Sequence, residues 1–169
     1  MRRLRRQCER RLEGIPVPRP FNLDQFCQGI ARTRGRRLQL QGVAGLSSTA
    51  PCGLWISVPA ADYVFFDANT TPLHAEHIVL HELGHIVCQH TVDGEVEHSA
   101  LARLMPDLDP GMIARVLGRV RYSTAQEQEA EMLASLIRAN SVRGLTGPAG
   151  IGGRRDTLGR LADVLSFEP

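Results

Sequence analysis

The segment from residue 72 to about residue 89 constrains the fold more than any other, because its pattern predicts one long and largely apolar helix. Thr71 is a favourable cap, and Pro72 suits the first helical position because the missing amide hydrogen would have no partner there. Gly84 is the only residue within the segment that disfavours a helix. We expect a short sheet to pack against this helix.

Local patterns predict the other elements of the same domain. Asn22 and Gln25 match a capping box, which predicts a helix over Leu23–Arg34. Alternating or apolar runs predict three strands of a small antiparallel sheet, at residues 37–43, 54–58 and 63–66. Composition predicts a second long helix over residues 124–140. Together these elements predict the α+β class.

The chain length favours one domain with a segment at each end. With 169 residues, the chain can close one hydrophobic core but not two large ones. We expect a basic N-terminal arm with a short helix (residues 1–19), a main domain (residues 20–143), and a glycine-rich linker with a C-terminal helix (residues 144–169). Two less regular helices are expected near residues 96–104 and 112–117.

The composition is that of a compact globular domain. Hydrophobic residues make up 43% and charged residues 22%, which excludes a disordered or fibrous chain. No apolar run reaches membrane-spanning length, and charged residues follow the N-terminus where a signal peptide would be apolar. We therefore expect a cytoplasmic protein without a membrane partner. The four cysteines form no Cys-x-x-Cys pair, so we expect free, mostly buried thiols.

Charge is distributed unevenly along the chain. Residues 1–37 carry 11 arginines against Glu9, Glu13 and Asp24, a balance of +8, so the remainder of this +2 chain is acidic. Clustered arginines can neutralise nucleic-acid phosphates. No helix-turn-helix, zinc-finger or aromatic-interleaved pattern accompanies them. The sequence therefore argues against nucleic acid and favours a solvated or partner-docking basic helix.

The residues that indicate chemistry are His81, Glu82 and His85, which form a His-Glu-x-x-His motif. Residues four apart lie on one face of a helix, so the two imidazoles can bind the same metal ion. Glu82 lies on the adjacent flank, where its carboxylate can act as general base on a water molecule at the metal. The motif therefore predicts a zincin-type zinc site.

A catalytic zinc site with two histidine ligands needs a third protein ligand. The second long helix carries three acids, Glu127, Glu129 and Glu131. Helical geometry places Glu127 and Glu131 beside an edge of small alanines that allows close approach to the histidine helix, whereas Glu129 points away. Glu127 and Glu131 are both candidates on this reasoning.

Glu127 also has a competing structural interpretation. Thr124 and Glu127 match a capping box, in which the glutamate would serve the start of the helix. Ser123 and Gln126 match an alternative box one residue earlier, which would leave Glu127 free to bind a metal.

On these motifs the chain resembles the ImmA/IrrE family of zinc-dependent metallopeptidases. The resemblance rests on the His81 to His85 motif, with Gly84 at the family's usual place, and on a Glu-x-Glu-Ala helix matched from Glu127 onwards. It implies a small zincin-like domain that holds one zinc per chain through His81, His85 and Glu127. The family has an Asn or Asp four residues after the glutamate ligand, and Glu131, the alternative ligand, takes that place here.

The resemblance also implies a function. It indicates an endopeptidase that cleaves a protein partner, typically a helix-turn-helix transcriptional repressor or an antitoxin. The alternative is a non-catalytic zinc-binding regulatory module that docks on a repressor or toxin. An oxyanion donor is also needed, and Tyr122, His98, His90 and nearby arginines are the candidates.

Three further residues near the motif have simpler interpretations. His74 and His77 lie on nearly the same helical stripe as the motif, where they are surface histidines or ligands of a second metal. Cys88 lies close to the metal face and is interpreted as a packed thiol rather than a ligand.

Overall fold

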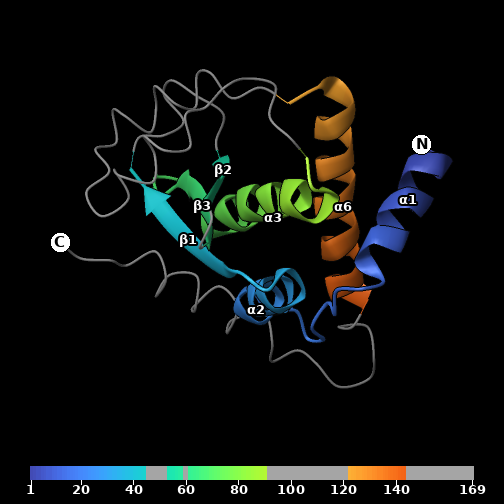
Figure 1. Ribbon diagram of the computed structural model, residues 1–169, viewed down its shortest axis with the longest axis horizontal. Coiled ribbons are helices and arrows are strands. Elements are labelled where there is room, and N and C mark those ends of the chain that lie inside the picture. Colours follow the sequence, from blue (N-terminus) through green and yellow to red (C-terminus); the bar gives the residue numbers. More distant parts are fainter. Residues whose placement is uncertain (45–52, 59–60, 91–121, 144–169) are drawn as a thin grey trace.

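A computed structural model describes residues 1–44, 53–58, 61–90 and 122–143 of the chain (Figure 1). The expected helices near residues 96–104 and 112–117, and the linker and helix expected over residues 144–169, lie outside the described residues. The described elements are mixed α and β. They are α1 (Arg2–Leu12), α2 (Leu23–Arg34), β1 (Arg37–Val43), β2 (Gly53–Val58), β3 (Ala61–Asp67), α3 (Pro72–Cys88) and α6 (Thr124–Arg143).

The predicted caps are present at the starts of two helices. At α2, the side chain of Asn22 accepts a hydrogen bond from the amide of Gln25 at 2.9 Å. At α3, the hydroxyl of Thr71 accepts from the amide of His74 at 3.3 Å. Such caps satisfy amides that have no partner inside the helix. Because they are local signals, they place both helix starts at the predicted residues.

The sheet has the order β1-β3-β2, and its strand directions differ from the prediction. β2 pairs with β3 antiparallel, with Gly53 opposite Phe66. β1 pairs with the other edge of β3 in parallel, with Arg37 opposite Ala61. The prediction of an antiparallel sheet is therefore wrong for β1. Side chains alternate with a period of two in both kinds of strand, so the sequence pattern identifies β1 without giving its direction.

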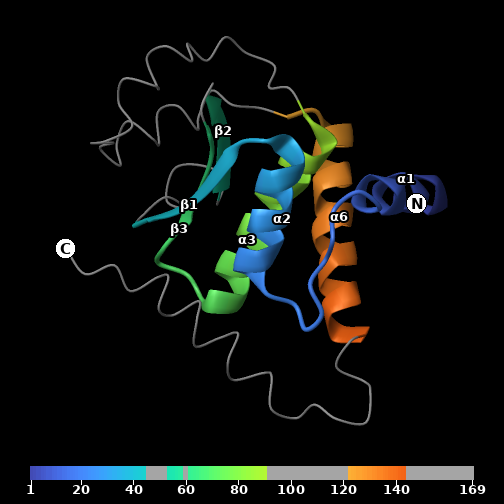
Figure 2. The same cartoon turned by 60° about the horizontal axis from the view of Figure 1, so that its bottom comes forward.

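The long helix α3 lies at the centre of the described fold. The sheet packs against one side of α3 and α6 packs against another, while α2 lies beside β1 (Figures 1 and 2). Burial is most complete along this stack, where the following side chains have exposed fractions below 2%: Phe26, Ile30, Leu54, Phe65, Leu80, Leu83, Ile86, Leu133 and Ile137. None of the described helices is long and apolar enough to cross a membrane.

The segment expected as a basic arm contributes to the core. α1 packs against the outer side of α6, away from the sheet (Figures 1 and 2). Its residue Cys8 is fully buried and Leu12 is 9% exposed. Cys8, Cys27 and Cys88 are free and buried, as predicted. The thin apolar stripe of α1 is therefore covered, and its arginines occupy the remaining surface.

α3 and α6 approach closely at Gly84. A Cβ atom on Gly84 would lie 2.9 Å from both the Cα atom and the carbonyl oxygen of Ala130. Ala130 and Ala134 are fully buried in this contact. The small-residue edge predicted for α6 therefore does face the histidine helix.

We expect Gly84→Ala to destabilise the protein by about 1–3 kcal/mol, because added volume in a packed contact forces the backbone to shift. The sign is informative, since Gly→Ala within a helix otherwise stabilises by about 1 kcal/mol. Urea unfolding followed by circular dichroism measures the effect. Gly29→Ala is the matched control, because Gly29 lies within α2 and the added Cβ would come no closer than 3.7 Å to its nearest neighbour, Pro16. A Gly84→Ala protein as stable as the wild type would contradict the close helix contact.

Candidate metal centre

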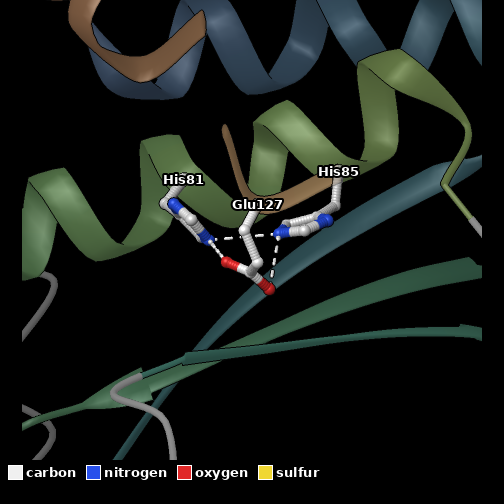
Figure 3. A group of neighbouring side chains, drawn as sticks. All are labelled: His81, His85 and Glu127. Carbon is white, nitrogen blue, oxygen red and sulfur yellow. Dashed lines mark hydrogen bonds and ion pairs between the residues drawn. The ribbon is translucent and has the colours of Figure 1, made fainter. Parts of the chain in front are cut away.

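Three side chains from two helices converge at one point. His81 and His85 extend from α3, Glu127 extends from the first turn of α6, and their polar atoms face one another (Figure 3). The Nε2 atom of His81 lies 3.1 Å from Nε2 of His85 and 3.1 Å from Oε2 of Glu127. The Nε2 atom of His85 lies 3.9 Å from Oε1 of Glu127. The structure therefore brings all three predicted ligands together.

The chemistry of this donor set fits a divalent cation. Donors about 2.0–2.2 Å from a zinc ion at tetrahedral angles lie roughly 3.3–3.6 Å from one another, close to the observed separations. Two imidazole nitrogens and a carboxylate point lone pairs at the same space, and a proton can bridge only one pair of them. One cation would satisfy the three donors together. His81, His85 and Glu127 could therefore hold a metal ion.

Glu127 is free for this role because another residue caps α6. The amide of Ser123 donates to the side chain of Gln126 at 2.8 Å, and the amide of Gln126 donates to the hydroxyl of Ser123 at 3.3 Å. This is the reciprocal capping box predicted as the alternative. The competing role of Glu127 as a capping residue is therefore not needed.

The two other acids of α6 face different partners. Glu131 contacts His77 at 3.3 Å and Nδ1 of His81 at 3.5 Å, on the side of the ring away from Glu127. Glu131 can therefore orient the ring of His81 through Nδ1, but it does not face the Nε2 atoms of His81 and His85. Glu129 points away from this site, as predicted, and its Oε2 atom lies 3.1 Å from Nε2 of His90.

Burial determines the protonation of His85. Its side chain is fully buried, and this burial, together with the nearby His81 and His90, lowers the pKa of His85 to about 3. Taking a cation out of water costs free energy, so the neutral imidazole is favoured. A neutral imidazole is the form that binds a metal ion.

Glu82 is a buried carboxylate next to the three converging side chains. It is 5% exposed, and its Oε2 atom has no hydrogen-bond partner among the described residues. The pKa of Glu82 is raised to about 8, chiefly by burial and also by the charge of Glu127, against a smaller lowering by a hydrogen bond from the backbone of Trp55. A buried oxygen without a partner is costly and therefore needs an explanation, and a catalytic role or a bound ion is among the usual ones.

Gly53 of β2 makes room for Glu82, a role that no sequence pattern predicts. A Cβ atom on Gly53 would lie 2.8 Å from Oε1 of Glu82 and 2.6 Å from a methyl carbon of Ile78. The absence of a side chain at this strand position lets the carboxylate lie against the backbone of β2. Only the packing of the strand on the helix reveals this contact.

Tyr122 borders the site from the residues before α6. Its ring stacks on His85, with centroids 3.7 Å apart and planes inclined by 23°. Its hydroxyl group is buried without a hydrogen-bond partner in the described part of the chain. Burial raises the pKa of Tyr122 above its usual range, and Glu82 and Glu127 raise it further, so the hydroxyl keeps its proton.

The other residues predicted for this site do not join the three converging side chains. Both ring nitrogens of His90 have partners, in His85 and Glu129, so His90 has no nitrogen left to donate to an oxyanion. Cys88 lies with His90 and Glu129 rather than with the three converging side chains, and burial raises the pKa of its thiol to about 12. His98 lies outside the described residues.

A pocket gives access to His81 and Glu127, two of the three converging side chains. It has a volume of about 470 Å³ and is lined by the first turn of α1, by His81, and by α6 residues that include Glu127 and Glu131.

We expect Glu82→Gln to stabilise the zinc-free protein increasingly as pH rises from about 4.5 to 8. The pKa of Glu82 is raised from 4.5 to about 8, so the native state holds this proton more tightly than the unfolded state does. The free energy of unfolding of the wild type therefore falls as pH rises through this window, by about 1.4 kcal/mol for each pH unit. Glutamine does not titrate, so the variant lacks this loss. Thermal unfolding of both proteins after chelation, at pH values from 5 to 8.5, measures the difference. A difference that is independent of pH would contradict a buried, protonated Glu82.

Comparison of the chain with protein-family models, with curated proteins and with solved structures finds no match.

Proposed function

We propose that this chain is a zinc-dependent metalloendopeptidase of the ImmA/IrrE type that hydrolyses a peptide bond in a protein partner. One zinc ion per chain would be held by His81, His85 and Glu127, with Glu82 as the general base. The observation that carries the proposal is the convergence of these three donors beside a buried carboxylate oxygen that has no hydrogen-bond partner among the described residues. A structural zinc site needs no such group next to its ligands.

The roles of the protein residues follow from their surroundings. When bound, zinc supplies Lewis acidity, which polarises a carbonyl group and makes water more acidic. Glu82 takes a proton from the attacking water and passes it to the leaving amine, a role suited to a carboxyl group whose pKa lies near neutrality. Tyr122 holds its proton, and no described residue bonds to its hydroxyl group, so it is the donor we assign to the developing oxyanion.

The sheet beside the site supports a peptide as the substrate class. β2 is an edge strand of the described sheet and packs against α3, and the backbone of Trp55 in β2 contacts Glu82. An edge strand can bind an extended peptide by backbone pairing. In line with the sequence resemblance, we place the substrate among transcriptional repressors or antitoxins, and the reaction in the cytoplasm.

The alternative, a zinc-binding regulatory module that docks on a repressor or toxin without catalysis, is favoured by one feature of α1. Its residues Arg2, Arg3, Arg6 and Arg10 line a surface hollow of about 390 Å³. A row of guanidinium groups on one face suits contact with an acidic partner. A regulatory module of this kind would not depend on Glu82, and this separates the two functions.

The test of the proposed function is peptide cleavage by the full chain. The protein, loaded with one equivalent of zinc, is incubated with a peptide library of high sequence diversity, and the products are identified by mass spectrometry. We expect new internal cleavage sites that vanish with a chelator and return when zinc is restored. Cleavage that persists without metal would contradict a metallopeptidase, and a zinc-loaded protein that cleaves nothing would favour the regulatory module.

A further inference from the structure

A chain of buried polar side chains leads from His85 to α1. The Nδ1 atom of His85 lies 2.9 Å from Nδ1 of His90. The Nε2 atom of His90 lies 3.1 Å from Oε2 of Glu129. On the other oxygen, Oε1, Glu129 accepts a hydrogen bond from Arg11 at 2.9 Å and another from Gln7 at 3.0 Å. His85, His90 and Glu129 are 0%, 8% and 9% exposed, so little water competes for these bonds.

Only one arrangement of protons satisfies this chain when His85 binds a cation. A cation at Nε2 of His85 requires the proton of that ring to be on Nδ1. Nδ1 of His85 then donates to Nδ1 of His90, which must be unprotonated there. The proton of His90 is therefore on Nε2, where it donates to Glu129. Glu129 thus favours the tautomer of His90 that has its proton on Nε2, and this tautomer of His90 favours the tautomer of His85 that has its proton on Nδ1.

The backbone is shaped to bring His90 back to His85. α3 ends at Gln89, which has a φ of 55° and lies in the left-handed region. Glycine is the usual residue at such a helix end, because a side chain disfavours this conformation. The turn lets the amide of His90 donate to the carbonyl of His85 at 3.0 Å and brings its ring against the ring of His85. The conformation at Gln89 is thus coupled to the His85–His90 contact.

We propose that His90 and Glu129 are positioning residues for the metal ligand His85. They hold its ring so that Nε2 faces His81 and Glu127, and Arg11 and Gln7 of α1 hold Glu129 in place. The proposal rests on the metal site of the proposed function but not on peptide hydrolysis. It also gives α1, a segment expected as an arm, a defined contact with the metal site.

A second metal site at Cys88, His90 and Glu129 is the competing interpretation, because these side chains also lie within 4.8 Å of one another. Their existing partners argue against it. Arg11 places a positive charge on Glu129 at 2.9 Å, and Glu129 already accepts three hydrogen bonds. Burial raises the pKa of the Cys88 thiol to about 12, which disfavours the thiolate that a metal would need.

The test is the zinc dissociation constant of the full chain at fixed pH, measured by competition with a chromophoric chelator. Loss of a group that orients a metal ligand typically costs about 10–100-fold in metal affinity. We expect a weakening of this size in His90→Leu and in Glu129→Leu. In His90→Asn most of the affinity should return, because the asparagine oxygen can accept the proton of His85.

Two controls separate positioning from other effects. His74→Ala removes an exposed histidine of the same helix and should leave zinc affinity unchanged. Cys88→Ser should also leave it unchanged, whereas a metal at the second cluster would be weakened by this substitution. Thermal unfolding of the zinc-free variants identifies any that fail to fold, and in that case His90→Ala and Glu129→Ala replace the leucine variants.

A spectroscopic readout tests the proton arrangement directly. Nitrogen-15 NMR of the histidine rings in the zinc-loaded protein should show His85 with its proton on Nδ1 and His90 with its proton on Nε2. A proton on Nδ1 of His90, or unchanged zinc affinity in folded His90→Leu, would overturn the proposal even if peptide is cleaved. Weakened zinc affinity without any peptide cleavage would support the proposal and contradict the proposed function. A wild-type chain that takes up no zinc would contradict both.

Discussion

Replacing Glu82 by glutamine is expected to lower peptide hydrolysis by about 10²–10⁴-fold, the usual effect of removing a general base. Glutamine has nearly the same shape as glutamate but cannot accept a proton at neutral pH. Glu82 is not among the three donors that converge, so the zinc content should stay at the wild-type value. The measurement compares the initial cleavage rate of a library peptide and the zinc content of the two proteins.

The matched control for this prediction is Glu76→Gln. Glu76 is a glutamate of α3 that is not among the three converging donors, and its loss should leave the cleavage rate unchanged. A Glu82→Gln protein that cleaves peptide at the wild-type rate would contradict the assigned base. A Glu82→Gln protein that loses zinc would mean that this carboxylate is itself a ligand.

Replacing Glu127 by alanine is expected to weaken zinc binding by more than about 100-fold, beyond the effect typical of residues that only support the ligands. Its carboxylate oxygens lie 3.1 Å from His81 and 3.9 Å from His85, so it is the acid that faces both histidines. The side chain is 46% exposed, so its truncation should not disturb folding. Competition with a chromophoric chelator measures the change.

Glu131→Ala is the comparison that decides between the two acids proposed from the sequence. Glu131 lies 3.5 Å from Nδ1 of His81 and contacts His77, so its loss should weaken zinc binding by no more than about tenfold. A larger loss of affinity in Glu131→Ala than in Glu127→Ala would make Glu131 the third ligand.

The features that the sequence predicts well are local ones. The caps at Asn22 and Thr71 involve residues three apart and appear in the structure as predicted. The spacing of His81 and His85 follows from the helix period alone. The approach of α6 to α3 was also predictable, because a run of small residues allows two helices to pack closely.

The features that the sequence does not predict depend on packing between distant segments. The parallel direction of β1 leaves no trace in its alternation. The contact of Gly53 with Glu82 requires the placement of β2 on α3. His90 returns to His85 through a left-handed residue, and the glutamine at that position carries none of the preference by which glycine marks such turns.

X-ray absorption at the zinc edge of the protein purified without added zinc tests the central claim most directly. If His81, His85 and Glu127 hold the ion, the spectrum should show only nitrogen and oxygen neighbours at about 2.0–2.2 Å, with the outer scattering of two imidazole rings. A sulfur neighbour at about 2.3 Å would contradict the account, because it would place the ion at the cluster of Cys88, His90 and Glu129.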